Sequence, residues 1–174
     1  MKIFCAPRLG AGGSAAAYSL LEYAFMAIYG GILPEIAKTP NGKPYFPDRP
    51  DVHFSLSHSA THVLCALSGE PVGADIESPR CISERAIAYF CSPEERSLFD
   101  PLDLWVLKES YIKLIGGNLA MVKSIRFSRV GSRIISQDEL SVSKLYRIDE
   151  CRAAVSAHGG CLPDSWVYVA RAGG

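Results

Sequence analysis

The sequence has no net charge, because 18 Lys and Arg residues balance 18 Asp and Glu residues over 174 positions. Proteins that bind nucleic acid generally carry a basic excess, so this balance argues against a nucleic-acid partner. The sequence also lacks a long apolar run: its most apolar stretch, 18–33, contains Glu22 and two glycines and is too short to span a bilayer. Since 1–13 has no apolar core of a leader peptide, we expect a cytoplasmic protein with no membrane partner.

The six cysteines lack the spacing of a redox centre or a closed zinc site, because no two of them form a Cys-x-x-Cys motif. Cys151, His158 and Cys161 come nearest to a zinc-ligand group, but their spacing is loose. We therefore expect most cysteines to be small buried apolar residues, as in other proteins of a reducing compartment. The Gly-x-Ser-x-Gly motif of serine hydrolases is also missing.

The composition is that of a folded domain, with 48% hydrophobic and 21% charged residues. It excludes a disordered tail and a collagen-like fibre. The length corresponds to about one domain, or to two small halves that share a core. The charges are segregated, since 68–104 holds three basic and eight acidic residues and 105–152 holds nine basic and five acidic residues. This segregation indicates either ordinary solvated surface or a cation site beside an anion site.

Helix signals divide the chain at several points. Apolar residues at helical spacing end at Gly30-Gly31, and Ser92-Pro93-Glu94-Glu95 has the pattern of a capping box. Ser83 and Asp100 are further candidate caps, the second followed by a proline. We predict helices over 14–29, 83–90, from 92, and over 100–115.

Strand signals lie between and after these helices. Apolar and polar residues alternate around Phe54, which is typical of a half-buried strand. A mixture of helices with strands that suit antiparallel pairing favours an α+β fold. We predict strands over 52–57, 63–67, 72–77, 124–130, 133–136, 145–148 and 166–170.

The first candidate site is Gly73-Ala74-Asp75-Ile76-Glu77. On a strand, Gly73, Asp75 and Glu77 share one face, and the two carboxylates are roughly 6–7 Å apart along it. Two hard oxygen ligands at that spacing suit Mg²⁺. The alternative is the ordinary solvent face of an edge strand.

Two further groups carry polar side chains that could act together. Glu109 and Lys113 are four residues apart on one helix face, as an exposed ion pair or as a third carboxylate and a phosphate-binding cation. Ser55-Leu56-Ser57-His58-Ser59 offers hydroxyls and an imidazole to an anion, or forms a polar turn with a structural histidine. Adjacent Ser57 and His58 do not make a hydrolase nucleophile and base.

Taken together, these segments resemble the larger, Sfp-like class of 4′-phosphopantetheinyl transferases. The resemblance covers about residues 42–127. It rests on four motifs in order: Gly42-Lys43-Pro44, Phe54-Ser55-Leu56-Ser57-His58-Ser59, Gly73-Ala74-Asp75-Ile76-Glu77, and the segment 105–116 with sequence WVLKESYIKLIG.

The resemblance implies a Mg²⁺-dependent enzyme. Such enzymes move the phosphopantetheine arm of coenzyme A (CoA) to a serine of an apo acyl or peptidyl carrier protein and release adenosine 3′,5′-bisphosphate. By the resemblance, the metal ligands are Asp75, Glu77 and Glu109. The same resemblance makes Glu109 the base and Lys113 the group that stabilises the leaving phosphate. The CoA contacts that it implies are Lys43, Ser57, His58, Lys108 and Lys113.

The resemblance also implies two similar small α+β halves, each a sheet with a helix, related by a pseudo-twofold. We expect them at 1–68 and 69–174, the second carrying the metal-binding motifs. Glu94 stands where relatives often have another acidic residue, although helix capping explains it without chemistry.

The sequence departs from the family in being short. Residues 9–37 contain no Lys or Arg, although this region usually holds the CoA 3′-phosphate, and only Arg8 and Lys38 flank it. One alternative is therefore a catalytically weakened module that binds CoA or a carrier protein. Another is a generic Mg²⁺-dependent phosphohydrolase.

Overall fold

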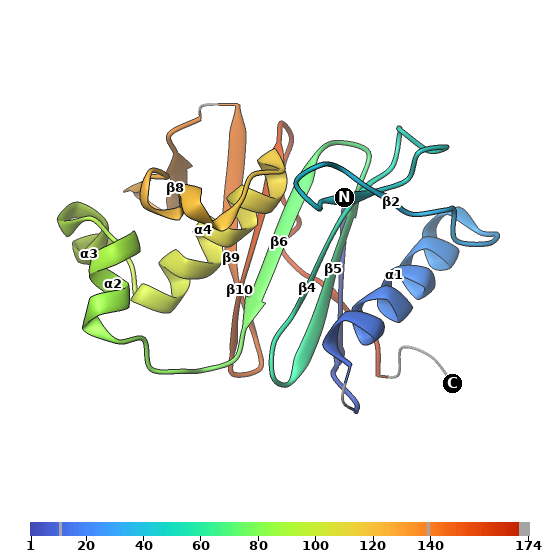
Figure 1. The fold of residues 1–174 in the computed structure, drawn as a ribbon, viewed down its shortest axis with the longest axis horizontal. Helices are drawn as coiled ribbons and strands as arrows, with labels where there is room; N and C mark the ends of the chain where they lie inside the picture. Colours follow the sequence, from blue (N-terminus) through green and yellow to red (C-terminus); the bar gives the residue numbers. More distant parts are fainter. Residues whose placement is uncertain (11, 139, 171–174) are drawn as a thin grey trace.

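The structure is a computed structural model and describes residues 1–10, 12–138 and 140–170. Two main β-sheets lie beside each other, each accompanied by a long helix (Figure 1). The α+β fold predicted from the sequence is confirmed. No described helix is both long and apolar enough to cross a membrane.

The first sheet has the strand order β11-β1-β5-β4. Strands β1 and β4 both pair antiparallel with β5, and β11 pairs parallel with β1. A short hairpin of two strands, β2 and β3, precedes β4. The elements of this part are β1 (Lys2–Pro7), α1 (Gly13–Tyr29), β2 (Ala37–Lys38), β3 (Pro44–Tyr45), β4 (His53–His58), β5 (His62–Ser68) and β11 (Val167–Tyr168).

The second sheet has the strand order β6-β10-β9-β8-β7, with antiparallel neighbours throughout. Strands β9 and β10 form a tight hairpin whose turn includes Asp149 at φ 50°. The elements of this part are β6 (Val72–Glu77), α2 (Glu84–Phe90), α3 (Pro93–Leu98), α4 (Pro101–Ile115), the 3-10 helix η1 (Leu119–Lys123), β7 (Phe127–Val130), β8 (Arg133–Ser136), β9 (Ser141–Ile148) and β10 (Cys151–His158).

The helix ends follow the sequence signals. The Ser92 side chain accepts from the Glu95 N–H while the Glu95 side chain accepts from the Ser92 N–H, so the predicted capping box of α3 is confirmed. Asp100 caps α4 through the Leu102 N–H, and α4 ends at Gly116, whose φ of 64° suits glycine. The predicted helix over 14–29 agrees with α1 within one residue.

Four strands were not predicted from the sequence, and two predicted strands, over 124–130 and 166–170, are shorter in the structure. Strands β1, β2, β3 and β10 carry no strand prediction, although β10 lies between β6 and β9 in the second sheet. The predicted strand over 124–130 is wrong at its start, because η1 precedes it and the Ser124 N–H bonds to the Met121 carbonyl oxygen. Strand β9 begins four residues earlier than predicted.

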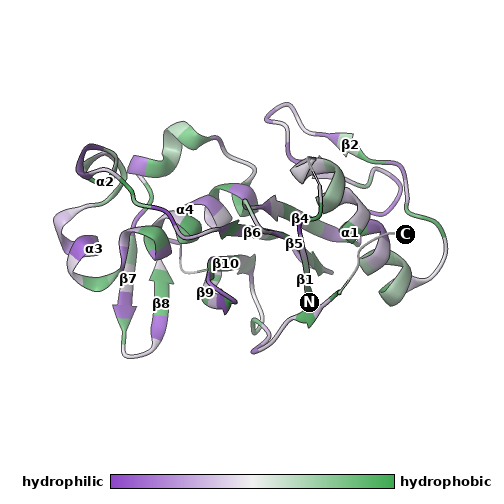
Figure 2. Cartoon of the chain, turned by 90° about the horizontal axis from the view of Figure 1, so that it is seen from below, coloured by the Kyte–Doolittle hydropathy of each residue, from purple (hydrophilic) through white to green (hydrophobic). Residues whose placement is uncertain are grey.

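Three apolar clusters form the core. One packs α1 on β4 and β5, one packs α4 and α2 on the second sheet, and a central one is drawn from strands of both sheets. Val72, Ala74 and Ile76 belong to the central cluster, so the predicted alternation along β6 is confirmed. Helix α3 and strand β7, at the end of the molecule away from α1, show strongly hydrophilic stretches in Figure 2.

The division at residue 68 nearly separates the two sheets. Strand β11, which follows that division in the sequence, nevertheless pairs with β1 in the first sheet. The domain boundary and the pseudo-twofold relation therefore stay predictions.

Candidate active site

The candidate site lies where helix α4 crosses strand β6. A Cβ atom placed on Gly73 would come within 1.9 Å of the Ser110 carbonyl oxygen and 2.3 Å of the Leu114 nitrogen. Only glycine therefore allows this backbone contact between α4 and β6. The close contact brings Glu109 and Lys113 of α4 over the face of β6 that carries Asp75 and Glu77.

Asp75 is the most constrained acidic residue of this site. Its side chain is 8% exposed, and its Oδ1 accepts from Lys113 Nζ at 2.7 Å and from Ser57 Oγ at 2.7 Å. Its Oδ2 is buried and has no hydrogen-bond partner. A buried carboxylate oxygen without a partner is costly, so this atom is a natural point for a ligand.

The other two predicted ligands lie around Asp75. Glu77 Oε1 accepts from Trp105 Nε1 at 3.1 Å and from Arg80 at 3.1 Å. The pKa of Glu109 is raised above its ordinary value, first by burial and then by the negative charge of Asp75, while Lys113 opposes the shift. Glu77 raises the pKa of Glu109 further, so both neighbouring carboxylates act on Glu109.

The three carboxylates are the ligands that the family resemblance implies for Mg²⁺. The donors suit that ion chemically, because all three are carboxylates and Asp75 Oδ2 is buried without a partner. Their side chains are not gathered into a closed site: among the described residues, no three His, Cys, Asp or Glu side chains are close enough to hold a metal ion. The structure thus supplies suitable donors without a completed coordination shell.

Lys43 and Lys113 line a cavity of about 210 Å³, and Lys113 also bonds to Asp75. Lys43 Nζ donates to the Leu114 carbonyl oxygen at 2.8 Å and to that of Val72 at 3.4 Å. Burial lowers the pKa of Lys43. The walls of the cavity come from the 41–44 loop, β4 and the end of α4, and include Asn41, Lys43, Ser55, Lys113 and Gly116.

The two predicted CoA contacts on β4 lie in different surroundings. Ser57 is buried, accepts from the Ile76 N–H at 3.3 Å and donates to Asp75. The single proton of its hydroxyl is therefore already used within the protein. His58 is exposed at the end of β4, and its ring lies against Gly13 in the first turn of α1.

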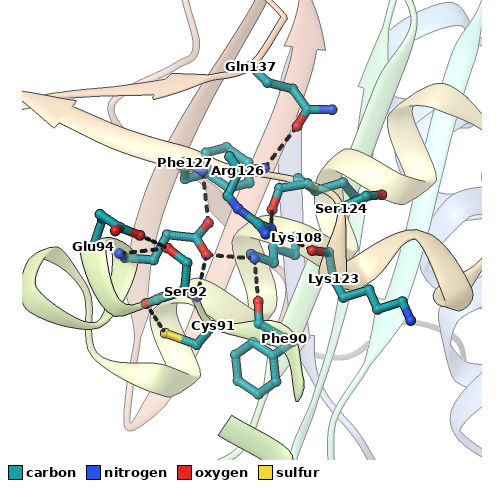
Figure 3. Close-up of polar contacts among 12 residues, drawn as sticks. Phe90, Cys91, Ser92, Glu94, Lys108, Lys123, Ser124, Arg126, Phe127 and Gln137 are labelled. Atoms are coloured by element: carbon teal, nitrogen blue, oxygen red, sulfur yellow. Dashed lines mark hydrogen bonds and ion pairs between the residues drawn. The ribbon is translucent and has the colours of Figure 1, made fainter. Parts of the chain in front are cut away.

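Lys108 requires a correction. Its side chain is fully buried, and its Nζ donates to Glu95 Oε2 at 2.9 Å and to the carbonyl oxygen of Phe90 (Figure 3). Glu95 also accepts the N–H groups of Ser92 and Phe127, so one carboxylate joins α3, α4 and β7. Because its ammonium is enclosed in this cluster, Lys108 does not reach a CoA phosphate in this structure.

Other acidic and metal-binding candidates also find structural roles. Glu94 is exposed and accepts from Ser92 Oγ at 2.8 Å. Cys151 and His158 occupy the first and last positions of β10, roughly 23 Å apart at about 3.3 Å per residue. At this distance Cys151 and His158 cannot both bind the zinc ion for which Cys161 was the third candidate ligand.

The cations flanking 9–37 are placed as follows. Arg8 donates to the Ser59 carbonyl oxygen at 2.8 Å, and Lys38 is exposed on β2. Trp105, which had no predicted role, donates to Glu77, and Ser55, predicted among the hydroxyls that could bind an anion, accepts the Ala74 N–H at 2.9 Å. Both belong to the quoted motifs, so their positions were visible in the sequence and only their contacts were not.

Comparison with known proteins agrees with this geometry. The family described as the 4′-phosphopantetheinyl transferase superfamily matches residues 71–167. This match includes β6 and α4 with Asp75, Glu77, Glu109 and Lys113. The chain belongs to the 4′-phosphopantetheinyl transferase superfamily.

Individual relatives match about half of the chain. The 4′-phosphopantetheinyl transferase Sfp of Bacillus subtilis (strain 168) is 40% identical over 90 residues, covering 46% of this chain and 40% of that protein. The 4′-phosphopantetheinyl transferase gsp of Aneurinibacillus migulanus is 37% identical over 89 residues, covering 45% and 37%. The 4′-phosphopantetheinyl transferase psf-1 of Bacillus pumilus is 37% identical over 90 residues, covering 46% and 39%. The matched part thus spans about 40% of the length of these relatives.

Proposed function

We propose that this protein transfers the phosphopantetheine arm of CoA to a serine of an apo acyl or peptidyl carrier protein, with release of adenosine 3′,5′-bisphosphate. The observation that carries the proposal is the contact of α4 with β6. It brings Lys113 onto the buried Asp75, whose charge acts on Glu109, and Lys113 lines a cavity together with Lys43. Carboxylates that suit a cation and a lysine that suits a phosphate thus lie close together, as a pyrophosphate with its cation requires.

Asp75, Glu77 and Glu109 would hold Mg²⁺, which when bound neutralises charge on the pyrophosphate. The pKa of Glu109 is raised first by burial and then by the negative charges of Asp75 and Glu77, and a cation beside these carboxylates would offset both effects. Among these carboxylates, Asp75 has a buried oxygen, Oδ2, without a hydrogen-bond partner, and this atom would gain most from a bound cation.

Glu109 is the proposed base for the serine hydroxyl of the carrier. Its raised pKa makes it a stronger base than an ordinary carboxylate, while it is still ionised above that pKa. We therefore expect transfer to increase with pH as Glu109 loses its proton.

Lys113 is the proposed partner of the leaving phosphate. Its Nζ is already fixed by the Ala74 carbonyl oxygen at 3.1 Å and by Asp75. A preorganised ammonium stabilises the charge that collects on the leaving group. Lys43 and the exposed His58 are proposed as further phosphate contacts, the first from the cavity wall and the second beside the first turn of α1.

A cytoplasmic location fits the six cysteines, all of which are free. The basic residues Lys123, Arg126, Arg129 and Arg133 follow α4 in the sequence and are exposed. We propose that this basic surface faces an acidic carrier protein.

One assay tests the proposed reaction against its alternatives. The protein is mixed with CoA, Mg²⁺ and an apo carrier protein, and the mass of the carrier is measured. We expect the carrier to gain phosphopantetheine. Binding without a change of mass would indicate a catalytically weakened module, and release of phosphate without a carrier would indicate a phosphohydrolase.

Substitution of the carboxylates assigns the reaction to this site. We expect Asp75→Ala and Glu109→Ala to abolish transfer while circular dichroism stays that of the wild type. Transfer by Glu109→Ala within about tenfold of the wild type would contradict the role of Glu109, since loss of a general base typically costs about 10²–10⁴ in rate.

A further inference from the structure

The edge of β6 that faces β4 is completed by side chains. Among the described strands, β6 pairs only with β10, and β4 pairs only with β5. The Ala74 N–H instead donates to Ser55 Oγ at 2.9 Å, and the Ile76 N–H donates to Ser57 Oγ at 3.3 Å. Two serine hydroxyls thus accept the β6 N–H groups that carbonyl oxygens of a neighbouring strand would accept in a continuous sheet.

Carbonyl groups on the same edge of β6 are completed by lysines. Lys43 Nζ donates to the Val72 oxygen, and Lys113 Nζ donates to the Ala74 oxygen and to the Leu56 oxygen of β4 at 3.5 Å. The seam between the sheets is therefore held by side chains that point into the candidate site. Because the same side chains join β4 to β6 and lie in the candidate site, a change in these contacts would also move the side chains of the site.

Ser55 and Ser57 differ in one contact only within this arrangement. Both are buried on β4, and each accepts one N–H of β6. Ser57 additionally donates its proton to Asp75 Oδ1 at 2.7 Å. The chain thus contains a matched pair in which one serine joins the strands and the other also holds a site carboxylate.

The contact of Ser57 restricts the Asp75 carboxylate. The last torsion of an aspartate is broad, so a carboxylate without fixed donors rotates readily. Two donors, Ser57 Oγ and Lys113 Nζ, both bind Oδ1 at 2.7 Å. Fixing Oδ1 from two directions fixes the carboxylate plane, and with it the direction of the unpartnered Oδ2.

We infer that Ser57 is a positioning residue for Asp75. It holds the carboxylate so that Oδ2 is presented to a divalent cation, and Ser55 has no such role. This inference rests on the proposed metal role of Asp75, but it concerns cation binding and not the transfer reaction. It also gives Ser57 a role other than the direct CoA contact expected from the sequence.

The test compares Ser57→Ala with Ser55→Ala. Mg²⁺ binding to each full-length protein is titrated by calorimetry without CoA, and Mn²⁺ binding is followed by electron paramagnetic resonance. Loss of a residue that orients a metal ligand typically costs about 10–100-fold in metal affinity, so we expect Ser57→Ala to lose about tenfold or more. We expect Ser55→Ala to stay within about twofold of the wild type.

Urea unfolding separates positioning from stability. Each alanine variant leaves one N–H of β6 without its acceptor, so we expect both to unfold at a lower urea concentration than the wild type, and Ser57→Ala somewhat lower than Ser55→Ala because it also loses the bond to Asp75. Ser57→Thr keeps the hydroxyl and should recover most of the cation affinity. Equal cation affinities for the two alanine variants, or no recovery by threonine in a folded protein, would overturn the inference.

The outcomes also separate this inference from the proposed function. If the wild type transfers phosphopantetheine but Ser57→Ala binds Mg²⁺ as tightly as Ser55→Ala does, the positioning role fails and the proposed function stands. If the wild type binds Mg²⁺ with the expected difference between variants but transfers nothing, the function fails and the positioning role stands. A wild type that binds neither cation overturns the positioning role whatever its activity.

Discussion

Two lysines of helix α4 form ion pairs with carboxylates of other elements, and the two pairs differ in burial and in how many of their polar atoms have hydrogen-bond partners. Lys108 and Glu95 are both enclosed, at 0% and 1% exposed side chain, and Glu95 accepts two backbone N–H groups in addition to the ammonium. Lys113 and Asp75 are at 30% and 8%, and one oxygen of Asp75 has no partner.

The difference indicates that the Lys108–Glu95 pair is structural, whereas the Lys113–Asp75 pair could still bind a ligand. In the first pair every side-chain nitrogen and oxygen has a partner, and breaking such a buried pair leaves an uncompensated charge. A pair with an unpartnered oxygen beside a cavity retains unused binding capacity. The two lysines are five residues apart in one motif, so the distinction lies in their surroundings.

The largest expected effect is on stability, from Lys108→Ala. Removal of this lysine leaves Glu95 charged and buried, which typically costs about 3–5 kcal/mol. Urea unfolding at neutral pH measures this loss. A Lys108→Ala protein with the wild-type unfolding midpoint but no transfer activity would place Lys108 in the substrate site and contradict its structural role.

A smaller loss of stability is expected from Lys113→Met. Because Lys113 is partly exposed and Ser57 still donates to Asp75, we expect a loss of about 1–2 kcal/mol. Transfer should fall by about 10²-fold or more, since Lys113 is proposed to stabilise the leaving phosphate. Steady-state transfer to an apo carrier measures this, and a fall of less than about threefold would show that Lys113 is structural, like Lys108.

The smallest expected effect is a gain of stability from Glu109→Gln. The folded state raises the pKa of Glu109, so it binds the proton more tightly than the unfolded chain does. The free energy of unfolding therefore falls as the pH rises from the unfolded pKa of Glu109 to its folded pKa. Above the folded pKa, Glu109 causes no further loss of stability.

Replacing Glu109 by glutamine removes that cost. We expect the thermal midpoint at neutral pH to rise by up to about 3 °C, and the gain to vanish at a pH below the unfolded pKa of about 4.3, where Glu109 is neutral in both states. Calorimetric scans at both pH values check this. A gain that is the same at both would exclude the charge of Glu109, disfavoured by burial and by the neighbouring carboxylates, as its cause.

Much of the fold followed from local signals. The bounds of β6, the capping box at Ser92 and the start of α4 at Asp100 depend on alternation and caps within a few residues, and the structure has them where predicted. Strand β10 was missed because its sequence CRAAVSAH is rich in small residues of low strand propensity. It needs small residues because α4 packs on it: Ser156 bonds to Ser110 of α4 at 2.8 Å.

The candidate site was predictable in its residues and less so in their contacts. Spacing along β6 and α4 placed Asp75, Glu77, Glu109 and Lys113 on faces that could meet. Helical spacing put Lys113 on the face of Glu109, but no pattern in the sequence showed that Lys108 is enclosed, because the ion-pair partners Glu95 and Asp75 lie on other elements. Ser57 likewise looked like a ligand contact until its acceptor was known.

The sequence by itself determined which residues form the helices and most strands, and which residue types face one another across α4 and β6, because helix and strand periods are local properties. The tertiary structure decided which lysine is enclosed, which serine holds Asp75, and which carboxylate oxygen is left without a partner. These depend on the approach of α4 to β6 at Gly73 and on the seam between two sheets. Burial and long-range contact set the charge state and the hydrogen bonds of a side chain, and neither is encoded within a single motif.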